Sequence, residues 1–328
     1  MPITKVALNT TELPAMIPLP SIQPSVDRSV AEANGPQNNE QQNQASQGLR
    51  QALSSGKPNE IDRAFDQVCN LFKAKVLSRE EVVAILARDV VDPQNCPMLN
   101  PGRTSPSAIV AYMKNLGRLC DEHVLSADDA FQILTDGEEQ DRVTPCELVL
   151  QGEAGQIKAL GDGLRNLVSN KHLTGDQIRR ILVADHELHP LRKCMVEGKN
   201  NAARVGAWTS LLETGAKAKC FSPSEAFNVL TSPRSPKGYT RPLIDLAFIR
   251  AKKDVVEAIV DAVNRLSACR PKETGAVDGP TVFKVMTPYL DRAMFTVRKD
   301  PSGDHPTLDR INEVREAWKK TAGSAEVR

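Results

Sequence analysis

The stretch Leu125-Ser126-Ala127-Asp128-Asp129 belongs to a pattern that recurs along this chain of 328 residues. Three other stretches match it in the same register: Leu77-Ser78-Arg79-Glu80-Glu81, Leu173-Thr174-Gly175-Asp176-Gln177 and Phe221-Ser222-Pro223-Ser224-Glu225. Their Ser or Thr residues stand at positions 78, 126, 174 and 222, so the numbering advances by the same interval, 48, each time. Several matches in one register predict an internal repeat with this period.

Each stretch also has the chemistry of a helix start. The Ser or Thr hydroxyl can accept a hydrogen bond from the backbone N–H three residues later, and the acid or amide at that position can bond back to the cap. The apolar residue before the cap is expected to pack on the first turn as a hydrophobic staple. The predicted helices continue to four apolar pairs, Ile85/Leu86, Ile133/Leu134, Ile181/Leu182 and Val229/Leu230.

A longer amphipathic helix is predicted before each cap, because apolar residues recur at i, i+3, i+7 and i+10. These residues are Ile61, Ala64, Val68 and Leu71; Ile109, Tyr112, Leu116 and Leu119; Ile157, Leu160, Leu164 and Leu167; Val205, Trp208 and Leu212; and Val256, Ile259, Val263 and Leu266. A short helix is predicted to open most units, often with a proline at its first position, as at Thr144-Pro145.

The predicted fold is therefore all-α: a solenoid of about five three-helix units that stack because none buries its apolar face alone. The units are expected to cover residues 49–287, and 288–328 are expected to form C-terminal capping helices and a tail. Residues 1–48 contain six prolines and a run rich in Asn and Gln. This composition predicts a disordered segment.

Composition excludes several classes of function. The 42 Lys and Arg residues are balanced by 41 Asp and Glu, a net charge of +1, which does not favour nucleic acid or an anionic membrane as a partner. No apolar stretch approaches the roughly 18 residues of a membrane helix. Seven cysteines without a close CxxC pair argue against a disulfide framework, so the folded part is expected in a reducing cytosol.

Parts of the repeat resemble degenerate ankyrin repeats. The resemblance rests on Thr144-Pro145-Cys146-Glu147-Leu148 with Gly152, and on Pro190-Leu191 through Gly198 to Leu211-Leu212-Glu213-Thr214-Gly215-Ala216. The period here is longer than that of ankyrin repeats by one capped helix. Ankyrin-like units behind a segment rich in Ser, Pro and Gln resemble type III secreted effectors of Gram-negative pathogens, in particular the repeat region of OspC-type effectors.

The resemblance implies secretion, delivery into a host cell and binding of a host protein, with a secretion chaperone on the N-terminal segment. In OspC-type effectors a catalytic domain precedes the repeats, and the segment 1–48 is too short for it, so no catalytic residue and no cofactor is carried over. Two alternatives stay open from the residues themselves: an effector enzyme with a Cys or His site on the repeat surface, and a cytoplasmic scaffold.

The loops that join the units are the predicted binding surface, because solenoid insertions project from one face and often contact the partner. One loop is acidic, a second contains two histidines and a third is basic. The candidate residues are Asp136, Glu138, Glu139 and Asp141; His186 and His189; and Arg234, Lys237 and Arg241. The alternative interpretation is that these charges only keep the loops soluble.

The candidate chemical groups are few. His186, His189 and Cys194 include ligand types that suit zinc, but they lack HExxH spacing and a fourth ligand, so we interpret the segment as a loop. Cys69, Cys120 and Cys269 are expected in packed positions. Cys146 and Cys220 are near helix starts, where a thiolate is favoured. Cys220 and His172 precede caps in adjacent units, which makes them a candidate nucleophile and base, although packing is the more favoured explanation of both.

Overall fold

The computed structural model describes residues 46–87, 104–136, 144–183, 201–231, 253–268, 279–299, 309 and 312–320. The chain divides into two units, Met1–Asn43 and Gln44–Arg328, and everything described lies in the second. Every regular element in these ranges is a helix. The all-α prediction is thereby confirmed.

Five long helices alternate with shorter ones. The long helices are α2 (Pro58–Lys73), α4 (Pro106–Asp121), α7 (Ala154–Ser169), α10 (Asn201–Lys217) and α13 (Lys253–Ala268). The shorter helices are α3 (Arg79–Leu86), α5 (Ala127–Thr135), α6 (Pro145–Leu150), α8 (Gly175–Val183) and α11 (Pro223–Thr231). The described helices also include residues 46–53, α14 (Gly279–Lys299) and residues 312–320.

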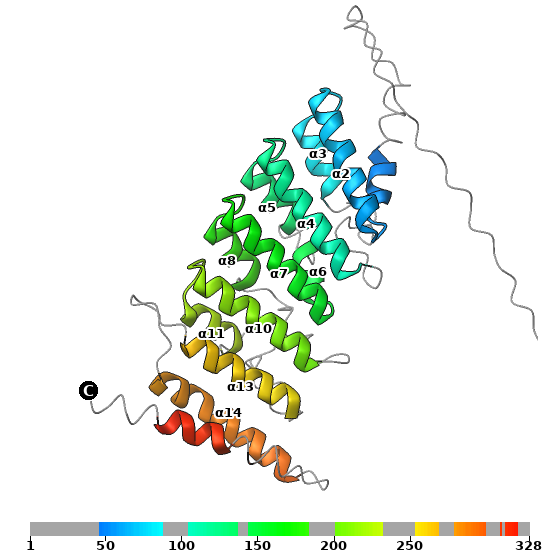
Figure 1. Cartoon of the computed structure of the whole chain (residues 1–328). Coiled ribbons are helices and arrows are strands. Elements are labelled where there is room, and N and C mark those ends of the chain that lie inside the picture. The colour runs from blue at the N-terminus through cyan, green and yellow to red at the C-terminus, as the bar shows by residue number, and fades with distance from the viewer. Residues whose placement is uncertain are drawn as a thin grey trace, which may run out of the picture. The chain divides into compact units, whose positions relative to one another are not determined.

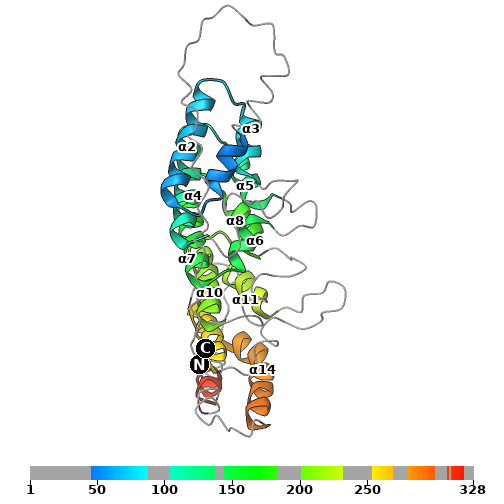
Figure 2. The same cartoon turned by 90° about the vertical axis from the view of Figure 1, so that its right-hand side faces the viewer.

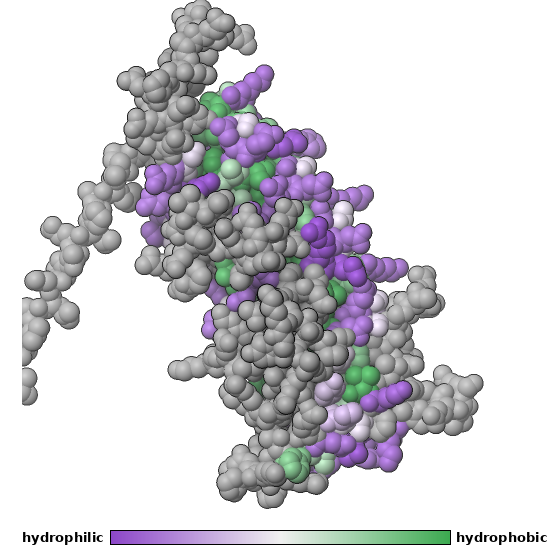
Figure 3. Space-filling model, turned by 180° about the vertical axis from the view of Figure 1, so that it is seen from behind, coloured by the Kyte–Doolittle hydropathy of each residue, from purple (hydrophilic) through white to green (hydrophobic). Residues whose placement is uncertain are grey.

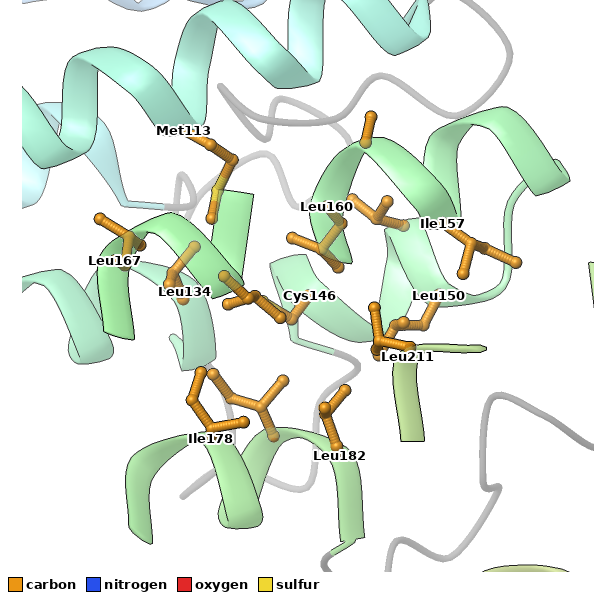
Figure 4. Packing of buried hydrophobic residues seen from close by; sticks show 14 of the residues in the cluster. Met113, Leu134, Cys146, Leu150, Ile157, Leu160, Leu167, Ile178, Leu182 and Leu211 are labelled. Carbon is orange, nitrogen blue, oxygen red and sulfur yellow. The ribbon is translucent and has the colours of Figure 1, made fainter. Parts of the chain in front are cut away.

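The long helices lie side by side in chain order (Figure 1), each packed on the next from α2 to α13. The view turned by 90° shows α3, α5, α8 and α11 as a second layer beside them (Figure 2). Side chains from α4, α5, α6, α7, α8 and α10 meet between the layers in one cluster that includes Leu134, Cys146 and Leu211 (Figure 4). From the side opposite to Figure 1, hydrophilic side chains edge the described part (Figure 3).

The four predicted helix starts are confirmed. At Ser78, Ser126, Thr174 and Ser222 the side-chain hydroxyl accepts a hydrogen bond from the N–H three residues later, at 3.1–3.2 Å. The side chain at that third position accepts in return from the N–H of the capping residue, at 2.7–2.8 Å. The apolar residues before the caps, Leu77, Leu125, Leu173 and Phe221, are all buried, as a hydrophobic staple requires.

The turn before each cap recurs at the same interval as the caps. Lys75, His123, Lys171 and Lys219 all adopt the left-handed conformation, with φ between 59° and 62°. The residue that follows each of them donates a backbone hydrogen bond to the carbonyl five positions earlier, at 2.8–3.0 Å. This bond closes the long helix as in a Schellman motif. This turn is not predicted from the sequence, because glycine rather than lysine or histidine is its usual signal.

The predicted core positions are buried, with Leu71 only half-buried and the side chain of Val256 outside the described set. Tyr112 and Trp208, which occupy equivalent positions, are fully enclosed and bond to the ends of short helices. The Tyr112 hydroxyl donates to the Leu86 carbonyl at 2.8 Å. Both aromatic residues therefore serve packing, as expected.

Two predicted boundaries fall inside helices. The first helix begins at residue 46, three residues within the segment 1–48 that was expected to be disordered, because Leu49 and Leu53 are buried one turn apart and anchor it. The boundary between 287 and 288 lies within α14, which continues through Pro288. The closing helix, residues 312–320, buries Val314 and Trp318, and the Trp318 indole donates to Asn264 of α13 at 2.6 Å.

Candidate functional site

The loop residues predicted to bind a partner lie almost entirely outside the described part of the chain. Asp136, half-buried directly after α5, is the one predicted binding residue that the structure places. The others, Glu138, Glu139, Asp141, His186, His189, Arg234, Lys237 and Arg241, are outside the described residues, and so is Cys194. The loop surface therefore stays a prediction.

The described cysteines, Cys69, Cys120, Cys146 and Cys220, are buried, and none of them is in a disulfide. Burial raises the pKa of the Cys120 thiol to about 11. Burial also raises the pKa of Cys69, and the hydrogen bond that its thiol donates to Glu122 at 2.9 Å acts in the same direction. The expectation of a favoured thiolate at Cys220 is wrong, because desolvation raises its pKa as well.

The proposed pairing of Cys220 with His172 stays a prediction, and the structure shows what else each side chain faces. The His172 Nε2 atom faces Asp121 of α4, 2.9 Å from its Oδ1. Cys220 packs with its Cα close to Gly175, the first residue of α8. The imidazole thus faces a carboxylate of α4, and desolvation raises the pKa of the Cys220 thiol.

A groove with a volume of about 530 Å³ opens between α7 and α10. Small and apolar residues dominate its lining, which extends inward to Ile178 and Leu182 of α8. On α7 it runs from Ala154 to Ser169, about 22 Å at 1.5 Å per helical residue. The groove is therefore long and narrow and follows the two helices.

The polar pairs that bridge α2 and α4 are replaced by other residue pairs along the groove. Between α2 and α4, Asn115 donates to Asp62 at 2.5 Å, Arg118 donates to Asp66 at 2.7 Å, and Lys73 pairs with Glu122 at 2.5 Å. Two repeats of 48 residues further along the chain, the positions equivalent to these three pairs hold Lys158 and Leu211, Asp162 and Thr214, and Ser169 and Ala218. All six of these residues line the groove. Shorter or apolar side chains on α10 thus leave open the seam that side chains bridge between α2 and α4.

Glycines shape the groove. Gly161 of α7 is buried, and a Cβ there would overlap Leu211 Cδ1 of α10, so the two helices approach closely at this point. Gly206 of α10 faces open space, with nothing within 4 Å of the place where a Cβ would lie. The absence of a side chain at Gly206 therefore widens the groove rather than relieving a clash.

The groove carries a surplus of positive charge. Its lining contains three basic residues, Lys158, Arg165 and Arg265, and one acidic residue, Asp162. Arg165 pairs with Asp162 at 3.1 Å, and Arg265 of α13 lies 3.5 Å from Glu213. Lys158 is exposed and has no ion-pair partner among the described residues. The surface can therefore attract an anionic group.

The groove is not predicted from the sequence, because the predicted helices are defined by their apolar faces alone. The available signal was on the opposite face of α10, where small residues recur at helical spacing up to the residue after its end: Ala203, Ala207, Ser210, Thr214 and Ala218. Such a row indicates a face without bulky side chains, but it does not tell an open groove from a close helix contact.

Two further features bear on function. Within the described ranges no three His, Cys, Asp or Glu side chains are grouped to hold a metal ion. None of the helices there is both long and apolar enough to cross a bilayer. Neither a protein-family model, nor a curated protein, nor a solved structure matches this chain.

Proposed function

We propose that this protein is a secreted bacterial effector that binds a host protein non-covalently through a solenoid of ankyrin-like helical units. The observation that carries the proposal is the recurrence, at one constant interval, of a left-handed turn followed by a reciprocal cap. In solenoids, stacked units of this kind create an extended surface that suits a macromolecular partner.

The finer description of the fold belongs to the same proposal. Residues 49–287 would form about five units, each with a long helix in the row from α2 to α13 and a capped helix in the second layer. The side-by-side packing of the long helices and the buried staples supports this description. The closing helix, residues 312–320, would cap the apolar end of the stack.

Binding rather than catalysis is favoured by the state of the thiols. A nucleophilic cysteine needs an accessible thiolate, whereas Cys69, Cys120 and Cys220 are buried and have raised pKa values. The surfaces left for function are the row of long helices, with its groove, and the loops between units.

Delivery into a host cell is tested with the N-terminal segment. Residues 1–48 are fused to an adenylate cyclase reporter in a bacterium with a type III secretion system, and cyclic AMP is measured in infected cells. The proposal expects cyclic AMP to rise with the fusion and to stay at background in a strain whose secretion system is deleted. No rise with the intact system would refute delivery by this route, and binding of a secretion chaperone to 1–48 would be sought in the same strain.

Binding is tested by affinity purification of the full chain from host-cell lysate. A matched Leu134→Asp variant, in which a fully buried core position receives a charge, identifies proteins that bind exposed apolar surface. The proposal expects at least one protein that binds the wild type and not this variant, at a reproducible stoichiometry. If both samples capture the same proteins, the repeat array is not the binding surface.

A further inference from the structure

We infer that the groove between α7 and α10 binds an acidic amphipathic helix of the partner, with a row of its apolar side chains in the groove and its carboxylates at the rim. This inference rests on the proposed function and names the chemistry of the partner. It concerns the described long helices and not the loops that the sequence singles out.

The shape of the groove suits a row of side chains. A volume of about 530 Å³ spread along about 22 Å is too narrow for a whole helix. It has room for the side chains that a helix presents at i, i+3 or i+4, and i+7, the usual anchors of a helix bound in a groove. Gly206 and Ala207 keep the α10 wall low, so a partner backbone can approach closely.

The basic residues of the groove indicate that the partner carries negative charge. Lys158 and Arg165 are seven residues apart on α7, two helical turns, and so lie on the same face about 10 Å from each other. Arg265 adds a basic group from α13, which lies 3.5 Å from Glu213, so Lys158 is the rim cation without an ion-pair partner among the described residues. Carboxylates spaced along a helix can pair with this distributed rim, which makes the encounter faster and more selective.

The same distribution argues against a lipid. A fatty acid carries one carboxylate at the end of its chain and needs a cluster of basic groups at one end of its site. Here the basic side chains are spread along α7 and across to α13, and Arg165 shares its charge with Asp162. The arrangement therefore matches a polypeptide with several acidic residues better than a single headgroup.

The inference is tested with a phage-displayed library of random peptides of about 16 residues, long enough for four helical turns, selected on the full chain. We expect enriched peptides to combine Leu, Met or Phe at helical spacing with several Asp or Glu residues. Their affinities are then measured by fluorescence anisotropy with labelled synthetic copies. A selection that yields no binder, or only basic or uncharged ones, overturns the inference.

Two variants locate the binding. Ala207→Trp fills the groove, and Lys158→Glu reverses an exposed rim charge; each is expected to weaken binding of the enriched peptides about tenfold. Lys114→Glu is the matched control, because Lys114 is an exposed residue of α4 that does not line the groove. It is expected to change affinity less than about twofold. Thermal unfolding checks that all three variants fold. If Ala207→Trp does not fold, Lys158→Glu alone still tests the inference.

The outcomes separate this inference from the proposed function. If the full chain captures a host protein equally well with Ala207→Trp and with Lys158→Glu, the proposed function stands and the groove is not the site. If acidic peptides bind the groove but no host protein is captured, the site is correct and the proposed function fails. Equal binding of the peptides to wild type and both variants rejects the groove directly.

Discussion

The indole Nε1–H of Trp208, on α10, donates a hydrogen bond to the backbone carbonyl oxygen of Leu150 at the end of α6, at 3.1 Å. Both residues are fully buried. The bond ties a long helix to a short helix that lies 58 residues earlier in the chain. Tyr112, at the equivalent core position of α4, bonds instead to Leu86 at the end of the capped helix α3, so the same position anchors two long helices to different short-helix ends.

The bond from Trp208 is expected to contribute measurably to stability. Trp208→Phe keeps an aromatic ring but removes the donor and part of the volume, so the free energy of unfolding should fall by about 1–3 kcal/mol. Trp208→Ala should cost about 3–5 kcal/mol. Urea denaturation followed by circular dichroism measures both. If both variants lower the free energy of unfolding equally, the hydrogen-bond donor rather than the packing of the ring accounts for the stabilisation by Trp208.

The caps provide a second prediction. Ser126→Ala removes the hydroxyl that accepts from the Asp129 N–H at 3.1 Å and donates to the Asp129 carboxylate at 2.7 Å. The free energy of unfolding should fall by about 1 kcal/mol. Ser169→Ala, at an exposed serine in the last turn of α7, is the control and should stay within about 0.5 kcal/mol of wild type. If Ser169→Ala lowers the free energy of unfolding as much as Ser126→Ala does, the capping role of Ser126 is contradicted.

Two helical glycines predict opposite results for the same substitution. A Cβ at Gly163 would lie 2.6 Å from Met113 Cβ and 2.7 Å from its Cγ, atoms close to the backbone of α4 that cannot simply rotate away. Gly163→Ala should therefore destabilise by about 1–3 kcal/mol. At Gly206 nothing lies within 4 Å, so Gly206→Ala should stabilise by about 0.5–1 kcal/mol through helix propensity. Differential scanning calorimetry of both variants would show the sign; stabilisation by Gly163→Ala would mean that α4 and α7 separate easily.

The buried thiol of Cys120 predicts a pH dependence. Its pKa is raised from 9.0 to about 11 by desolvation, with Asp121 and Asp129 adding to the effect. A raised thiol pKa means that the folded state holds the proton more tightly, so this contribution is complete below pH 9 and is lost as pH rises toward 11. The stability difference between wild type and Cys120→Ala should therefore fall by about 2 kcal/mol between about pH 8 and pH 10.5. A difference that does not change over that range would place the thiol in contact with solvent.

How far the sequence predicts this structure depends on whether the signal is local. Ser126 and Asp129 specify a helix start within four residues, so the cap follows from the sequence alone. Burial of Trp208 follows from the spacing of its apolar neighbours. The groove has no local signal in the sequence. At the positions where Asp62 and Asn115 form a hydrogen bond between α2 and α4, α7 and α10 carry Lys158 and Leu211, which line the groove. This difference can be recognised only when the packing of consecutive long helices is known. The left-handed turn at Lys171 is hidden for another reason, because lysine gives no signal for it.

That turn gives the last prediction. Lys171 has φ of 62°, a conformation that costs a residue with a Cβ about 1 kcal/mol and costs glycine almost nothing. Lys171→Gly is therefore expected to raise the free energy of unfolding by about 0.5–1 kcal/mol, measured by urea denaturation. Lys158→Gly, in the interior of α7, is the matched control and should lower it by about 1 kcal/mol. Destabilisation by Lys171→Gly would show that the attraction between its ammonium group and the C-terminal end of α7 exceeds the cost of the backbone conformation.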